Sequence, residues 1–212
     1  VSTSEPFDNI EKAERHEKAL AAGKPVTYSF TAPEHGVYEI VVNGEENEYD
    51  IALRVEALKG TSKLVSVSPP GVVYKNLNVW AGTKRIKDAL IRFKVENSWL
   101  TSNNIASGNV KMVLWENGKW VQLDTTQITK DNSFTYYEAK TDGFSVFAIV
   151  GLKEGEVVPT ETAKPTPVTT PAGEKTPVTE ATEKESPGFG AVSIISAMVL
   201  MVALRMRKRE RR

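Results

Sequence analysis

The sequence predicts a mainly β protein whose folded part is a β-sandwich of about ten short strands. Runs rich in β-branched and aromatic residues recur through residues 1–152, and Gly, Asn, Asp and Pro turn signals separate them. Many short strands with frequent turn signals are typical of a sandwich. The composition then changes twice. We therefore expect three parts: a β-sandwich domain over residues 1–152, a disordered Thr/Pro-rich stalk over 153–186, and a C-terminal segment, 187–212, with one hydrophobic helix.

The first strands are predicted at residues 26–31 and 37–42, with a turn at 33–36 between them and a turn at Asn43-Gly44 after the second. Residues 49–58 alternate, and the apolar face consists of Tyr49, Ile51, Leu53, Val55 and Ala57. Residues 10–22 are ambiguous. Their apolar spacing and their Glu and Lys residues permit a helix there.

Two further strands are predicted at residues 72–80 and 89–96. Ser98 then precedes an apolar pair, and we expect it to be the N-cap of a short helical turn that runs toward Ile105. The clearest hairpin spans residues 110–123, because Asn117-Gly118 between two strand runs favours a turn with positive φ at both positions. A second hairpin is predicted over 134–150, with its turn at 141–143. Both faces of its second strand are apolar, as in a central strand.

Four tryptophans stand out because they serve either a sugar-binding platform or the packing of a sandwich. Trp115 and Trp120 flank the Asn-Gly turn and are placed to pair across the hairpin. Core or cross-strand packing is the favoured interpretation for all four: Trp80, Trp99, Trp115 and Trp120.

The titratable residues give no clear site. His16 lies in a charged stretch and His35 in a turn, so both are predicted at the surface. A group of carboxylates after Asn43-Gly44 offers the oxygen ligands that Ca²⁺ prefers, but its spacing does not match a calcium loop. A solvated acidic loop is favoured there, formed by Glu45, Glu46, Glu48 and Asp50.

Catalytic motifs are missing from the sequence. There is no cysteine, no G-x-S-x-G nucleophile motif and no phosphate-binding loop. We therefore expect a protein that is not an enzyme, with no cofactor, no metal and no catalytic residue.

The charges are unevenly distributed. Lys+Arg and Asp+Glu both number 27, so the net charge is 27 − 27 = 0. The last eight residues carry six cations and one glutamate, which leaves 21 − 26 = −5 for residues 1–204. An acidic body argues against nucleic acid as a partner. The six cations are Arg205, Arg207, Lys208, Arg209, Arg211 and Arg212.

An uncharged stretch over residues 188–204 precedes this basic tail. As a helix it measures roughly 25 Å at 1.5 Å per residue, which is near the lower limit for crossing a membrane. The cations that follow predict a cytoplasmic C-terminus, so residues 1–186 are expected outside the cell. A span so short and so terminal favours a processing signal over a permanent anchor.

Residues 187–212, PGFGAVSIISAMVLMVALRMRKRERR, resemble the archaeal PGF-CTERM sorting signal. In that family an archaeosortase recognises the Pro-Gly-Phe motif, removes the hydrophobic tail and transfers the protein to a membrane lipid. The resemblance implies that Pro187, Gly188 and Phe189 are the recognition residues.

The segments VYKNLNVWAG, IRFKVENSWL, LWENGKW and TDGFSVFAI resemble the PGF-pre-PGF domain, over roughly residues 7–150. This resemblance implies location and architecture, because the family has no established activity. It also favours an extended segment over a helix at residues 10–22.

These observations predict a structural protein on the extracellular face of an archaeal cell membrane, anchored in the membrane and then through lipid. The alternative is an extracellular binding or adhesion module for glycans or envelope proteins, and a third possibility is an enzyme whose catalytic part lies upstream. The chain begins at Val1 without an apolar export signal, so we expect that signal upstream.

Overall fold

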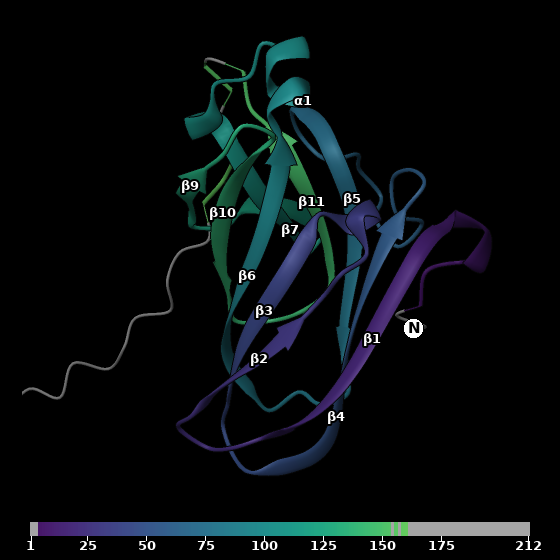
Figure 1. Cartoon of the computed structure of the whole chain (residues 1–212). Helices are drawn as coiled ribbons and strands as arrows, with labels where there is room; N and C mark the ends of the chain where they lie inside the picture. Colours follow the sequence, from purple (N-terminus) through teal and green to yellow (C-terminus); the bar gives the residue numbers. More distant parts are fainter. Residues whose placement is uncertain (1–3, 154, 157, 161–212) are drawn as a thin grey trace, which may run out of the picture. The chain divides into compact units, whose positions relative to one another are not determined.

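The computed structural model describes residues 4–153, 155–156 and 158–160. Within them the protein is mainly β, with eleven strands in two antiparallel sheets (Figure 1). The six-stranded sheet has the order β1-β4-β5-β11-β7-β8, and the five-stranded sheet has the order β2-β3-β6-β10-β9. The prediction of a mainly β fold with about ten strands is confirmed.

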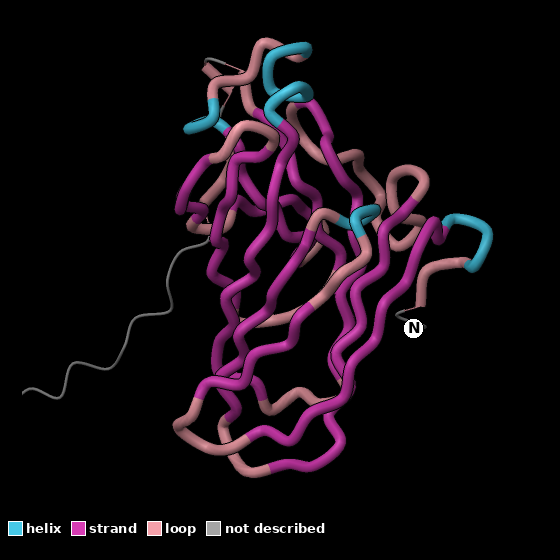
Figure 2. Tube along the Cα trace, in the orientation of Figure 1, coloured by secondary structure: helices cyan, strands magenta, loops and turns pink. Residues whose placement is uncertain are grey.

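The strands are β1 (Ile10–Leu20), β2 (Pro25–Ser29), β3 (Val37–Gly44), β4 (Glu48–Leu58), β5 (Val72–Ala81), β6 (Ile86–Glu96), β7 (Val110–Glu116), β8 (Lys119–Gln122), β9 (Thr125–Lys130), β10 (Phe134–Thr141) and β11 (Val146–Gly151). Within the described residues, helical structure is limited to short turns in the connections, as Figure 2 shows. These are η1 (Phe7–Asn9), η2 (Pro33–His35), α1 (Asn97–Ser102) and η3 (Ser107–Asn109).

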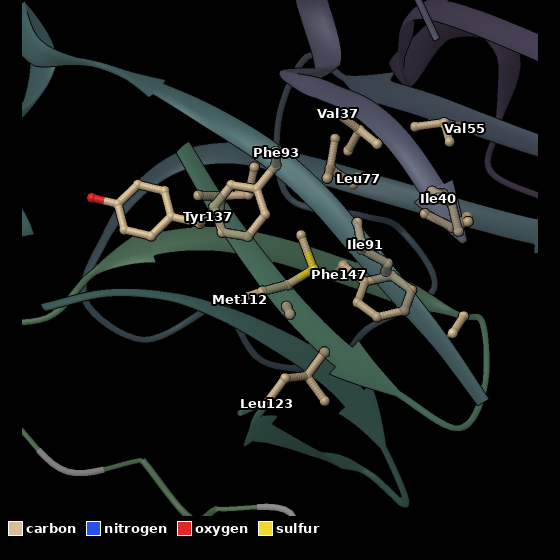
Figure 3. Packing of buried hydrophobic residues seen from close by; sticks show 14 of the residues in the cluster. Val37, Ile40, Val55, Leu77, Ile91, Phe93, Met112, Leu123, Tyr137 and Phe147 are labelled. Carbon is tan, nitrogen blue, oxygen red and sulfur yellow. The ribbon is translucent and has the colours of Figure 1, made fainter. Parts of the chain in front are cut away.

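The main hydrophobic core receives side chains from both sheets (Figure 3). The five-stranded sheet contributes, among others, Ile40, Phe93 and Tyr137, and the six-stranded sheet contributes Leu77 and Phe147. All of these are at most 1% exposed. Burial of each large apolar side chain contributes about 1.5–3 kcal/mol, which explains how this fold holds together without disulfide bonds.

Residues 10–20 form a strand, so the helix that their apolar spacing permitted is wrong and the extended conformation is confirmed. β1 pairs along its whole length with β4, from Ile10 opposite Leu58 to Leu20 opposite Glu48. Most of its side chains are exposed because β1 is an edge strand. Charged side chains on an edge strand oppose pairing with another molecule. This role accounts for the Glu and Lys residues that favoured a helix.

The hairpin predicted over residues 110–123 is confirmed. Asn117 and Gly118 have φ of 50° and 78° between β7 and β8, as an Asn-Gly turn requires. The hairpin predicted over 134–150 is wrong, because β10 pairs with β6 and β9 while β11 pairs with β5 and β7. Residues 142–145 therefore cross from one sheet to the other. The interpretation of residues 146–151 as a central strand is confirmed.

Three local predictions are also corrected. The N-cap of α1 is Glu96 and not Ser98, which lies inside the helix, and no side chain caps it. Tyr49 is 81% exposed, although Ile51, Leu53, Val55 and Ala57 are buried as expected. A positive φ of 54° at Asp50 interrupts the alternation between Tyr49 and Ile51. The pair Asn43-Gly44, read as a turn, still belongs to β3.

A second hydrophobic cluster lies on the outer face of the six-stranded sheet. Val146, Ala148 and Val150 of β11 point to this face, since Phe147 and Ile149 between them enter the main core. The cluster continues over β7 and β8 and includes residues from two further parts of the chain: Leu64 and Val65 from residues 59–71, and Leu152 and Val158 from the described residues that follow β11. Trp120 Nε1 donates a hydrogen bond of 2.8 Å to the Val67 carbonyl, which fixes the first segment. The Gln122 N–H donates to the Pro159 carbonyl at 2.7 Å, which fixes the second.

Across the described residues, no helix has the length and apolar character needed to cross a membrane. Residues 161–186 of the predicted stalk and the predicted helix, 188–204, lie outside the described residues.

Candidate functional site

A sizeable cavity in the described part of the protein lies where the chain passes between the sheets. Residues 82–85 connect β5 to β6 there, and residues 142–145 connect β10 to β11. The cavity measures about 700 Å³, and we call it the sheet-end cleft. This volume falls within the range of about 300–1,000 Å³ that is usual for ligand pockets. Residues that line the cleft include Lys63, Asn78, Trp80, Lys84, Trp115 and Phe144.

Trp80 is the most exposed aromatic side chain in the lining of the cleft. It lies near the end of β5, opposite Arg54 of β4, and is 43% exposed. Leu77 and Val79 fill the main core, so the alternation of the strand turns Asn78 and Trp80 to the outer face. An exposed tryptophan beside a cavity offers a flat apolar surface that a ligand can cover.

Asn78 and Glu56 form a buried polar pair beside Trp80. Asn78 Nδ2 donates a hydrogen bond of 2.9 Å to Glu56 Oε2, and Arg54 Nε donates one of 2.7 Å to Glu56 Oε1. Glu56 is 6% exposed and Asn78 is 4% exposed. These bonds hold the side chains in place, so polar groups in fixed positions lie next to the aromatic surface of Trp80.

A second cavity, of about 410 Å³, shares Asn78 and Trp80 with the cleft. We call it the outer-face hollow. It extends toward β1 and the N-terminal segment and is also lined by Phe7, Arg15 and Arg54. Phe7 is 89% exposed. Two exposed aromatic side chains therefore border adjoining cavities on one face of the sandwich.

The rim of the sheet-end cleft carries exposed charges: two cations, Lys63 and Lys84, and one carboxylate, Asp142. The backbone of Lys63 is fixed, because its N–H donates to the buried Glu5 carboxylate at 2.8 Å. Glu5 also accepts a hydrogen bond from Ser62 Oγ at 2.6 Å. Neither lysine forms an ion pair with another described residue.

The packing predicted for the tryptophans holds for three of the four. Trp115 and Trp120 are cross-strand partners with ring centroids 5.3 Å apart, and Trp99 packs edge-on against Tyr74 at 4.9 Å. Trp80 departs from the prediction because 43% of the residue remains exposed to solvent. The sequence signal that identifies it is the alternation in β5, which places Asn78 and Trp80 on one face.

A second polar cluster joins β1 to the turn at residues 33–36, and sequence reasoning missed it. Glu14 accepts hydrogen bonds from the N–H of Thr31 at 3.0 Å and of Ala32 at 2.8 Å. His16 Nε2 lies 2.8 Å from the same carboxylate, and His35 Nε2 lies 3.4 Å from it. Burial opposes the ionisation of Glu14, but these hydrogen bonds outweigh it and lower its pKa to about 2.

His35 is fully buried, so its predicted surface position is wrong. The turn that contains it folds over the core, and the ring packs edge-on against Phe30 with centroids 5.9 Å apart. Burial lowers the pKa of His35 below its ordinary value, although the Glu14 carboxylate opposes the shift. His16 is partly exposed at the surface, as predicted.

The acidic residues at 45–50 are partly paired by a cation from a neighbouring loop. Arg85 Nη1 lies 3.0 Å from Glu46 Oε1 and 3.8 Å from Glu48 Oε1. The backbone joins the two segments as well, since the Glu45 N–H donates to the Arg85 carbonyl at 3.0 Å. Among the residues that the structure describes, no group of three or more His, Asp or Glu side chains is placed to hold a metal ion.

The sorting-signal residues predicted from the sequence lie outside the described residues. They are Pro187, Gly188 and Phe189, together with the basic residues from Arg205 to Arg212. The structure therefore does not test their roles.

No protein-family model matches the chain, and no curated protein matches it either. The resemblance to the two PGF families accordingly stays a prediction from the quoted residues.

Proposed function

We propose that this chain is a non-catalytic, structural part of an archaeal cell-surface protein, exported and anchored through its C-terminal signal. One sequence observation carries the proposal: Pro187-Gly188-Phe189, then 15 uncharged residues, then a basic end. An apolar stretch followed at once by cations inserts into a bilayer and stops there, because moving the cations across it is costly. The sandwich is then held outside the membrane and the Thr/Pro-rich segment sets its distance from it.

The proposed processing requires a membrane enzyme as partner. An archaeosortase recognises Pro187, Gly188 and Phe189 and replaces the hydrophobic tail by lipid. Before processing, the cations from Arg205 to Arg212 keep the C-terminus cytoplasmic. The described domain suits this location, since it has a hydrophobic core between two sheets and a charged edge strand that discourages aggregation.

The test is the mass of the protein purified from the membranes of its own cell. We expect a mature chain that lacks Arg212 and carries added lipid mass. Replacement of Pro187, Gly188 and Phe189 by alanine is expected to leave the tail in place. The matched control replaces Ser193 by alanine inside the apolar stretch and is expected to be processed normally. An intact Arg212 terminus in the unaltered protein would contradict the proposal.

A second candidate function is an extracellular binding module, and the exposure of Trp80 favours it. A side chain of this size contributes to stability when it is buried, yet 43% of Trp80 remains exposed at the boundary of two cavities. Titration of the protein with soluble glycans or envelope proteins, monitored by tryptophan fluorescence, tests this candidate. No change in fluorescence with any glycan or envelope protein would count against it.

A further inference from the structure

The outer face of the six-stranded sheet is unevenly covered. Over β11, β7 and β8 the apolar cluster is completed by Leu64 and Val65 from residues 59–71 and by Leu152 and Val158 after β11. Toward β4 and β5 that cover ends, and the sheet-end cleft and the outer-face hollow lie there. The two cavities share Asn78 and Trp80, so they adjoin at these residues, and we call the pair of cavities the groove. A groove of this kind suits an elongated ligand better than a single small molecule.

The chemistry of the groove combines an aromatic surface with fixed polar groups. The flat ring of Trp80 suits the C–H face of a sugar ring, which is apolar. Hydroxyl groups around a sugar are both donors and acceptors, and Asn78, Arg54 and Glu56 offer both. The hydrogen bonds among these three side chains hold them in position before a ligand arrives, which reduces the entropy that binding costs.

The charges along the cleft favour a negative ligand. Lys63 and Lys84 are exposed and have no ion-pair partner among the described residues, whereas only Asp142 contributes a carboxylate to this cleft. The lining of the cleft thus has a net charge of 2 − 1 = +1, and the hollow adds two cations and two carboxylates, so the whole groove keeps a net charge of +1. In contrast, residues 1–204 have a net charge of −5. The cationic cleft therefore attracts an acidic ligand, whereas the net negative charge of the rest of residues 1–204 repels it.

We infer that this groove binds an acidic oligosaccharide, with one sugar ring on Trp80 and a carboxylate near Lys63 and Lys84. The inference rests on the second candidate function, the binding module, and is independent of the lipid anchor. A negative binding result therefore leaves the processing experiment untouched, and an unprocessed tail leaves the binding result untouched.

The experiment uses the full chain in a polyoxyethylene detergent, because detergents with sugar headgroups would compete for the site. Tetra-galacturonate is titrated into the protein at low salt, and heat and tryptophan fluorescence are measured. The neutral galactose tetramer of the same linkage is the matched ligand. We expect tetra-galacturonate to bind and the neutral tetramer to bind at least tenfold more weakly. Added salt should lower the affinity for tetra-galacturonate, because it screens the attraction between the charges.

The variants separate the aromatic contribution from the ionic one. Trp80→Ala is expected to weaken tetra-galacturonate binding about tenfold or more, as is usual for a central aromatic contact. Its control is Tyr49→Ala, which removes another exposed aromatic ring that borders neither cavity. The double variant Lys63→Gln/Lys84→Gln is expected to remove most of the salt dependence. Its control is Lys87→Gln, an exposed lysine outside the cleft.

Three results would overturn the inference. The first is the absence of binding at millimolar tetra-galacturonate. The second is equal binding of the neutral tetramer, which would exclude an acidic ligand. The third is unchanged affinity in Trp80→Ala, with near-ultraviolet circular dichroism showing that the variant is folded. Because Trp80 is an exposed side chain near a strand end, we expect this variant to fold.

Discussion

Replacement of Glu14 by glutamine is expected to destabilise the sandwich by about 2–3 kcal/mol at pH 7. The Glu14 carboxylate accepts hydrogen bonds from the N–H of Thr31 and of Ala32, and it contacts His16 and His35. Hydrogen bonds to a charged group contribute about 1.5–3 kcal/mol each, and glutamine keeps only one acceptor oxygen. Both N–H groups reach Oε2, so the glutamine oxygen would accept from them only as a neutral group, and the amide NH₂ in place of Oε1 could no longer accept from Thr31 Oγ1.

The dependence on pH identifies the charge as the cause. The pKa of Glu14 is lowered to about 2 in the folded protein, against an ordinary value of 4.5. The unfolded chain therefore takes up a proton before the folded one, so the stabilisation is complete above about pH 4.5 and is lost as the pH falls toward 2. The difference between the wild type and Glu14→Gln should shrink over this same interval.

The assay is unfolding of the full chain by urea, followed by tryptophan fluorescence. All four tryptophans lie in the described sandwich, so the signal reports this domain alone. The expected loss corresponds to a fall of roughly 4–12 °C in the melting temperature of a domain of this size. The control is Glu17→Gln on the same strand. Its side chain is 48% exposed and pairs only with Arg15, so the change should stay within about 0.5 kcal/mol. A loss below 0.5 kcal/mol for Glu14→Gln, or an equal loss at about pH 2.5, would refute the reasoning.

Two further predictions concern packing and alkaline pH. In Gly151→Ala the new Cβ would lie 2.7 Å from a side-chain carbon of the buried Ile105, so urea unfolding should show a loss of about 1–3 kcal/mol. Gly143→Ala meets nothing within 4 Å and should change stability by less than about 1 kcal/mol; equal losses in both variants would contradict this. Burial raises the pKa of Tyr28 and of Tyr137 to about 12, so their folded forms stay protonated when the unfolded ones ionise above about pH 10. Stability should therefore fall as the pH rises from 10 to 12, and absorbance at 295 nm should show two tyrosines ionising last; ionisation of all six near pH 10 in the folded protein would contradict this.

The sequence predicted those features of the fold that depend on local chemistry. The turn at Asn117-Gly118 needs positive φ at both positions, and few other residue pairs allow it, so the β7–β8 hairpin was predictable. The apolar face of β6 was predictable for a similar reason, because burial on one side of a strand leaves a period of two.

The features that could not be predicted from the sequence depend on contacts between distant segments. Whether residues 142–145 form a hairpin turn or a crossing between sheets is decided by the partners of β10 and β11, which lie far away in the chain. The burial of His35 likewise depends on Glu14 of another strand. In both cases the local residues permit either arrangement, and tertiary packing selects one.

The candidate site also combines a feature that the local sequence determines with one that distant contacts determine. Alternation in β5 was sufficient to place Asn78 and Trp80 on one face, but not to show whether that face is covered. Leu64, Val65, Leu152 and Val158 cover the outer face over β11, whereas a cavity lies beside Trp80 of β5. An exposed tryptophan contributes less to the stability of the fold than a buried one, so the exposed part of Trp80 adds little to stability. Trp80 is therefore the side chain that the proposed oligosaccharide would cover, and replacing it separates the proposed binding from the stability of the fold.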